Sequence, residues 1–306
     1  MGVSTHVRLS SIVPARFLRP LAVANLVANI LIVVTGGVVR LTGSGLGCPT
    51  WPRCTEDSYV AHEALGINGA IEFGNRMLTW VLVAVAIACW LAALAHRASA
   101  GANGDRSVRL ATLIALYVPA QAIIGGITVL TDLNPYVVAF HLLVSMALIG
   151  LCVLLVEVTR HSDTWAAGSP ERAPTQTRRL GWLIYGVGWV VLWLGTLVTG
   201  SGPHAGDLDA RRTGLDPQVW SHVHASAVYV LVALTLGMLA LAHRQQLAGV
   251  RRAAGALLLV ELLQGVVGFV QYFNDLPVPL VTVHMLGASL TAAAMAWVVV
   301  RAQRTV

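Results

Sequence analysis

Long apolar runs separated by short polar segments make up most of the chain. Eight runs are long enough to cross about 30 Å of hydrocarbon at about 1.5 Å per helical residue. They fall at 18–39, 73–95, 110–130, 137–158, 181–199, 220–242, 253–273 and 279–300. Lipid offers backbone groups no hydrogen-bond partner, so each run should be helical. The pattern predicts an all-α integral membrane protein of eight transmembrane helices. We expect the first to be retained rather than cleaved as a signal peptide.

An internal repeat divides these runs into two sets of four. Short motifs recur in the same order in both sets: Leu41–Gly45 and Val198–Gly202, which share Thr-Gly-Ser-Gly; Gln121–Gly125 and Gln264–Gly268; and His141 and His284. Each histidine lies 20 residues beyond its glutamine. Such self-similarity is the signature of a duplicated unit.

The repeat also predicts the domain organisation. We expect two tandem four-helix bundles, residues 1–165 and 181–306, joined by a linker at 166–180 that is rich in Arg, Ser and Pro. Because each unit has an even number of spans, both halves share one orientation. A pseudo-twofold axis along the membrane normal should relate them, as in other parallel repeats.

Composition agrees with a lipid environment. Hydrophobic residues make up 56% of the chain and charged residues only 11%, against about 25% charged residues in a soluble domain. The mean hydropathy is +0.72. A sequence pI near 9.6 would suit a nucleic-acid-binding protein, but all 20 basic residues are arginines scattered between apolar runs. Membrane lipid, not nucleic acid, is therefore the expected partner.

The distribution of arginines predicts the orientation of the chain. Fifteen lie on the side of the amino terminus: Arg8, Arg16, Arg19, Arg97, Arg106, Arg109, Arg160, Arg172, Arg178, Arg179, Arg244, Arg251, Arg252, Arg301 and Arg304. Four lie on the opposite side: Arg40, Arg53, Arg211 and Arg212. Positive residues concentrate in cytoplasmic loops. We therefore expect a multi-pass protein of the bacterial cell membrane with both termini in the cytoplasm.

The cysteines divide into two kinds. Cys89 and Cys152 lie within spans, where a free thiol behaves as a small hydrophobe. Cys48 and Cys54 lie in the first external loop, where an oxidising compartment favours a disulfide bond. Two interpretations stay open for this pair: a structural staple that closes a small loop, or a redox-active pair that delivers or accepts electrons.

Four histidines near the external ends of spans are candidates for metal or haem ligation. Neutral imidazole is the commonest metal ligand in proteins, and bundle cores are where cofactors sit. His141 and His284 open spans four and eight, while His222 and His224 open span six. A lone membrane histidine can instead bond a neighbouring helix. In the second half, His224 can face His284, which would fill both axial positions of a haem iron.

The first half departs from this symmetry. The segment that should face His141 contains Glu72, Asn75 and Arg76 but no histidine, so His141 is the only strong ligand expected there. Glu72 shares a helix face with Asn75 and Arg76. It is either a proton acceptor beside an open iron position or the partner of Arg76 in an ion pair. Arg40 and Arg76 are either partners for haem propionates or snorkelling helix-end residues.

These motifs resemble one known family. Gly36–Cys54, Glu72–Arg76, Thr199–Asp207 and the histidines at 141, 224 and 284 are similar to the signature of haem A synthases, and the sequence resembles an actinobacterial member. The resemblance covers nearly the whole chain. The family has an eight-helix, two-half fold and oxidises the C8 methyl group of haem O to a formyl group. The product, haem A, serves terminal cytochrome oxidases.

The resemblance implies a role for each matched residue. His224 and His284 match the axial pair of a haem b cofactor, His141 a ligand of the substrate haem, and Glu72 the catalytic glutamate. Cys48 and Cys54 match the external cysteine pair. The chain departs from the family pattern in two ways. Asn75 stands where many members have histidine, and the loop of residues 200–219 lacks the second cysteine pair that many members have. The family pattern favours His224 over His222, because a small or basic residue follows the ligand and Ala225 stands there.

Together these features predict an oxidoreductase with haem O as substrate and haem b as cofactor. His141 should bind the substrate in a pocket with Asn75, Arg76 and Arg40, Glu72 should act beside it, and haem b should pass electrons. Delivery by a haem O synthase and a homo-oligomer are compatible with the sequence, which leaves the electron acceptor and the oxygen source open. The alternatives are a non-catalytic di-haem b electron-transfer cytochrome and a transporter built on the parallel repeat.

Overall fold

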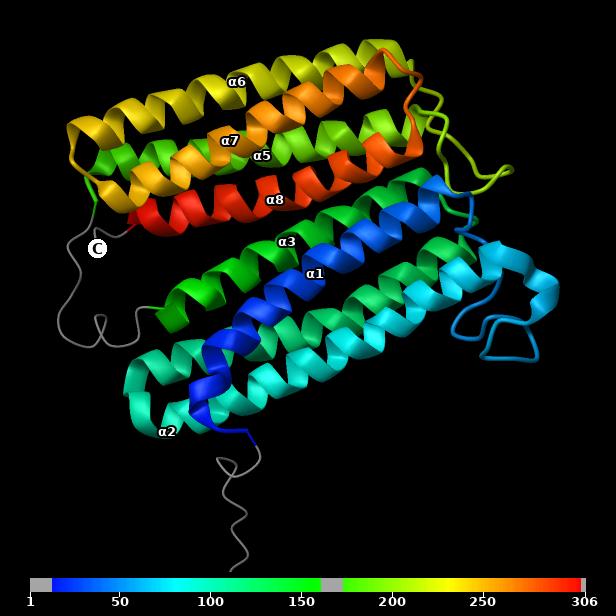
Figure 1. The fold of residues 1–306 in the computed structure, drawn as a ribbon, viewed down its shortest axis with the longest axis horizontal. Helices are drawn as coiled ribbons and strands as arrows, with labels where there is room; N and C mark the ends of the chain where they lie inside the picture. The colour runs from blue at the N-terminus through cyan, green and yellow to red at the C-terminus, as the bar shows by residue number, and fades with distance from the viewer. Residues whose placement is uncertain (1–12, 161–172, 304–306) are drawn as a thin grey trace, which may run out of the picture.

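The computed structural model describes residues 13–160 and 173–303, which form long helices connected by loops. The helices are α1 (Leu18–Leu41), α2 (Gly66–Leu130), α3 (Pro135–Arg160), α5 (Thr175–Ser201), α6 (Pro217–Arg244), α7 (Ala248–Tyr272) and α8 (Val278–Gln303). Short 3-10 turns at Ala15–Phe17 and Glu63–Leu65 precede α1 and α2. Figure 1 shows α1–α3 as one group and α5–α8 as the other.

The described residues contain eight apolar helical segments that are long enough to span a membrane. Helix α2 supplies two of them, Glu63–Arg97 and Gly104–Leu130, and Figure 1 shows it folding back on itself. An ion pair between Arg97 and Asp105, 2.6 Å long, lies at this turn. Outward faces are apolar, as at Trp80, which is 68% exposed. The prediction of an all-α, multi-pass membrane protein is confirmed.

The two halves pack through a small set of helices. Helices α1, α2 and α3 contact one another, and α5 to α8 form the second group. Across the interface, α8 contacts α1 and α3, and α5 contacts α3. Exchanging the halves would convert the α1–α8 pair into the α5–α3 pair. The pseudo-twofold axis stays a prediction, and these pairings are those that it requires.

The turns before α3 and α8 repeat in their backbone as well as in their sequence. Asp132 and Leu133 have positive φ angles of 50° and 56°, and Asp275 and Leu276 both have φ angles of 56°. Leu133 N donates to Thr128 O at 2.8 Å, and Leu276 N donates to Gln271 O at 2.9 Å. Non-glycine residues rarely adopt positive φ. Its recurrence means that α3 and α8 enter their halves in the same way.

The predicted linker is only partly described. Residues 161–172 lie outside the described part of the chain, while α5 begins at Thr175. Residues 175–180, which we predicted as linker, are therefore helical. Pro174 precedes the helix with an extended ψ of 145°, and Thr177 on the first turn is fully buried. Burial of Thr177, whose hydroxyl group donates to Gln245 Oε1, ties this turn to the end of α6.

Residues 42–62 and 202–216 form one end of the bundle, called here the loop end, where the halves also meet. Gly45 N donates to Gly206 O at 2.8 Å, and Leu133 packs with Ala205 and Ala210. Arg40 Nε donates to His204 O at 2.8 Å, and its Nη2 donates to Thr199 O at 3.1 Å. The Arg40 guanidinium group thus ties α1 to the loop of the second half.

Replacing Arg40 should weaken the docking of the halves. Arg40→Gln removes two charge-assisted hydrogen bonds to buried or half-buried carbonyls, so we expect the free energy of unfolding to fall by about 3 kcal/mol. Denaturant titration of the purified protein in detergent measures this change. Arg211→Gln, at an exposed loop position, is the matched control and should leave stability unchanged. Equal stability of the two variants would contradict this role of Arg40.

Candidate functional site

His141 and His284 occupy equivalent positions in the two halves. Gln121 Nε2 donates to His141 O at 3.2 Å, and Gln264 Nε2 donates to His284 O at 2.9 Å. In the first half, Ser145 Oγ also donates to His141 O at 3.0 Å and accepts from Gln121. The glutamine of the neighbouring helix therefore fixes the second turn of α3 and of α8 in the same way.

The rings of these histidines face glycines. A methyl group on Gly125 would lie 3.3 Å from His141 Cε1, and one on Gly268 would lie 3.6 Å from His284 Cε1. Both Nδ1 atoms are buried and lack a hydrogen-bond partner among the described residues. A buried polar atom without a partner is costly. Each half therefore contains a buried imidazole whose Nδ1 atom has no hydrogen-bond partner among the described residues.

His224 and His222 differ in burial and in hydrogen-bond partner. His224 is half-buried, and its Nδ1 lies 3.1 Å from Val191 O on α5. His222 is exposed, with its Nδ1 2.8 Å from Gln218 O of its own helix. His224 therefore points toward α5 and His222 does not, while the pairing of His224 with His284 stays a prediction.

Asn75 takes the corresponding place in the first half. Its Oδ1 accepts from Thr35 Oγ1 at 2.8 Å, so its side chain is held against α1. A methyl group on Gly36 would lie 4.0 Å from Asn75 Nδ2. A methyl group on Gly195 of α5 would lie 3.4 Å from His224 Cε1. Asn75 and His224 thus each lie against the first helix of their half, and only His224 offers an imidazole.

Glu72 and Arg76 hold the loop that carries the cysteines. Arg76 Nη2 and Nε donate to Glu72 Oε1 at 2.6 and 3.1 Å, and Cys48 N donates to Glu72 Oε2 at 2.7 Å. Arg76 also donates to the carbonyls of Cys48, Thr50 and Arg53 at 3.0, 3.0 and 3.1 Å. The Glu72–Arg76 ion pair, one of the two interpretations of Glu72 in the sequence, is present. Glu72 also lies beside the cysteine loop.

The cysteines follow the division predicted from the sequence. Cys48 and Cys54 form a disulfide bond, while Cys89 and Cys152 are free and buried. Trp51, inside the disulfide loop, packs its ring against Gly126 of α2. His141 contacts the preceding residue, Gly125. The loop therefore reaches the same stretch of α2 as His141.

Several residues of this site were not singled out for a role in the sequence analysis. Gln121 and Gln264 served only as repeat markers, although their fixed distance from the histidines was a usable signal. Trp51 gave no local signal, because its contact with Gly126 spans 75 residues of sequence. Arg40 was predicted to line a pocket with Asn75 and Arg76, which stays a prediction, and its guanidinium group binds the carbonyls of His204 and Thr199.

Comparison with known proteins now adds to this geometry. Residues 19–206, more than half of the chain, match the COX15-CtaA family, described as cytochrome oxidase assembly protein. The chain is 31% identical over 150 residues to the heme A synthase of Geobacillus kaustophilus, covering 47% of this chain and 45% of that protein. It is 32% identical over 143 residues to the heme A synthase of Shewanella oneidensis, covering 44% and 43%.

A third relative gives the same result. The heme A synthase of Geobacillus thermodenitrificans is 29% identical over 147 residues, which cover 47% of this chain and 44% of that protein. The chain thus spans less than half the length of these curated relatives. The family match extends over all of α1 to α5 and into the loop that follows. This chain belongs to the COX15-CtaA family of cytochrome oxidase assembly proteins.

Proposed function

We propose that this protein is a haem A synthase, which oxidises the C8 methyl group of haem O to a formyl group in the bacterial cell membrane. The observation that carries the proposal is the unequal pair of histidine sites in a duplicated frame. Both halves have the Gln–His arrangement, but only the second supplies a second imidazole. His224 and His284 would together hold a haem cofactor in the second half, and His141 alone would hold a haem substrate in the first.

The residues of the second half fit a haem b. His224 directs Nδ1 at a backbone carbonyl, which fixes the ring and leaves Nε2 for iron, as is usual for metal-bound histidine. The buried Nδ1 of His284 lacks a partner among the described residues. Gly195 and Gly268 let α5 and α7 approach the two rings closely. The described residues contain no cluster of three or more His, Cys, Asp or Glu for a bare metal ion, whereas haem iron needs only two protein ligands.

Residues of the first half would bind the substrate. His141 would be the protein ligand of haem O, and Asn75 and Arg76 would line the pocket beside it. Arg40, at the same end of α1, would support it by fixing the loop of the second half. The apolar tail of haem O suits a site open to lipid. Haem b, when bound by His224 and His284, supplies a one-electron relay.

Glu72 is the residue we assign to proton transfer. With water as the oxygen source, oxidation of a methyl group to a formyl group releases protons while the electrons pass to an external acceptor, and a carboxylate is a suitable acceptor for those protons. Arg76 occupies Oε1 of Glu72 through two hydrogen bonds, so Oε2, which accepts one backbone hydrogen bond from Cys48, keeps a free lone pair. Arg76 would orient the carboxylate. The disulfide loop would cover the site through Trp51.

The pigment of the purified protein tests the proposal. Expression in cells that make haem O but no haem A should yield protein carrying low-spin haem b, and extraction should recover haem A. A folded, haem-loaded protein with two haems b and no haem A would show a di-haem electron-transfer cytochrome instead. A protein without any haem spectrum would agree with a transporter. Cells that lack haem O synthase are the matched control and should give haem b without haem A.

A further inference from the structure

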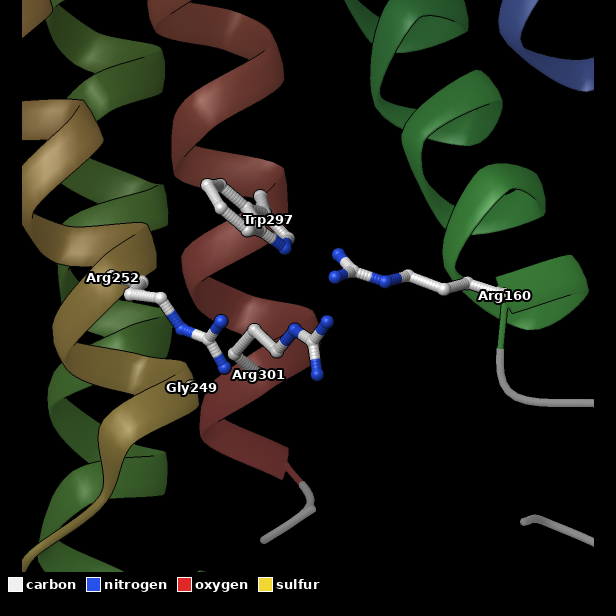
Figure 2. Close-up of a pocket in the computed structure, with 5 residues that line it drawn as sticks. All are labelled: Arg160, Gly249, Arg252, Trp297 and Arg301. Carbon is white, nitrogen blue, oxygen red and sulfur yellow. The ribbon is translucent and has the colours of Figure 1, made fainter.

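A small basic cavity lies between the two halves, at the opposite end of the bundle from the disulfide loop. Its volume is about 80 Å³, and it is lined by Arg160, Gly249, Arg252, Trp297 and Arg301, called here the arginine pocket. Arg160 ends α3, Gly249 and Arg252 lie in the first turns of α7, and Trp297 and Arg301 lie in the last turns of α8. Three helices from both halves therefore meet around it (Figure 2).

The pocket carries an excess of positive charge among the described residues. Arg301 Nη2 pairs with Glu157 Oε2 at 2.9 Å, and Arg160 Nη1 lies 3.8 Å from Glu157 Oε1. Figure 2 shows the side chains of Arg160 and Arg252 directed toward Arg301. One carboxylate thus lies beside two of the three guanidinium groups of the pocket. Arg301 is only 7% exposed, so solvent screens the charge of this group poorly.

Two buried donors in the pocket have no acceptor. Arg301 Nε and Trp297 Nε1 are buried and make no hydrogen bond within the described part of the chain. Both groups can only donate, so neither can satisfy the other. Leaving such donors unpaired destabilises the folded protein. The group that would complete the pocket is therefore an acceptor that also carries negative charge.

We propose that the arginine pocket binds a phosphate group, either the headgroup phosphate of an anionic lipid or inorganic phosphate. Guanidinium groups match phosphate oxygens with paired hydrogen bonds, and basic pockets between transmembrane helices bind lipid headgroups. The pocket lies at the ends of α3 and α8, where an apolar span meets polar surroundings. Bound phosphate would link the two halves through Arg160, Arg252 and Arg301. The proposal does not depend on the haem chemistry above.

Arg252→Gln is the informative variant, because Arg252 is exposed and can be replaced without leaving Glu157 unpaired. Arg251→Gln is the matched control: Arg251 is the exposed neighbour on α7, has the same charge and does not line the pocket. The full-length protein is purified in detergent. Native mass spectrometry then measures retention of cardiolipin and phosphatidylglycerol against phosphatidylcholine. The midpoint of thermal unfolding in inorganic phosphate, compared with chloride at equal ionic strength, shows whether free phosphate binds.

Anionic lipid should be retained by the native protein and bound about fivefold more weakly by Arg252→Gln, the factor expected for one basic residue at a membrane surface. Arg251→Gln should bind as the native protein does. Stabilisation by inorganic phosphate that Arg252→Gln loses would support the pocket with free phosphate as its ligand. The proposal is overturned if the native protein retains anionic lipids no better than phosphatidylcholine and is stabilised by phosphate no more than by chloride. It is also overturned if Arg251→Gln weakens binding as much as Arg252→Gln.

Discussion

His284→Ala should remove low-spin haem b from the purified protein. The substitution deletes one of the two imidazoles that we propose would hold haem b, and His224 alone would leave the haem without its second protein ligand. We expect haem b content to fall by more than about tenfold, since even the loss of an outer partner of a metal ligand costs about 10- to 100-fold in affinity. Absorption spectra of the reduced protein, together with extracted haem per polypeptide, measure the effect.

The matched control is His222→Ala. His222 lies on the same helix turn as His224 but is exposed and bonds the carbonyl of Gln218 in its own helix, so its loss should leave the haem b spectrum intact. A low-spin signal that survives in His284→Ala would refute the pairing. Loss of that signal in His222→Ala, with His224→Ala unaffected, would assign the ligand to the exposed histidine.

Glu72→Gln should abolish haem A formation while leaving haem b in the second half. A lost general base typically lowers rates by about 10²- to 10⁴-fold. The amide keeps the size of the side chain, although its single oxygen can accept only from Arg76 or from Cys48 N. Arg76 still donates to the carbonyls of Cys48, Thr50 and Arg53, so the cysteine loop should stay in place. The measurement is haem A extracted per haem b from cells supplied with haem O, with thiol labelling of Cys48 and Cys54 to follow the loop.

Arg76→Gln separates proton transfer from loop support. It removes the same ion pair and also the donors to the carbonyls of Cys48, Thr50 and Arg53. A purely structural role for Glu72 predicts that Arg76→Gln loses at least as much haem A as Glu72→Gln and labels more readily at the cysteines. A role in proton transfer predicts the larger loss in Glu72→Gln with the disulfide intact. Normal haem A yield in Glu72→Gln would end the assignment.

The repeat is the feature that the sequence predicted most fully. The equal spacing of Gln121 to His141 and of Gln264 to His284 reappears as the same hydrogen bond in each half. The matched turns at Asp132 and Asp275 share their unusual backbone. Both results depend on short-range order: a helix and the turn before it are specified by the residues within them. Spans, turns and equivalent positions could therefore be identified without knowing how the helices pack.

The local environment of single residues was less accessible. Thr175 and the five residues after it belong to the predicted linker by composition, yet they form the first turns of α5. Arg40 ends an apolar run in the same way as many snorkelling arginines do, yet it binds carbonyls more than 150 positions away in the chain. In both cases burial against another element, rather than composition, decides the conformation.

By itself, then, the sequence determined an all-α membrane protein of eight spans in two repeated units, with histidines near one end of the helices. Hydropathy and spacing carry this information because a span needs only length and apolar side chains. Tertiary structure alone decided which histidine of span six turns inward, because two residues differ by about 200° around a helix and hydropathy does not say which face meets a partner. It also brought Glu72 and Arg76 of α2 into contact with the disulfide loop. No local sequence pattern specifies the path of that loop, so this contact could not be predicted.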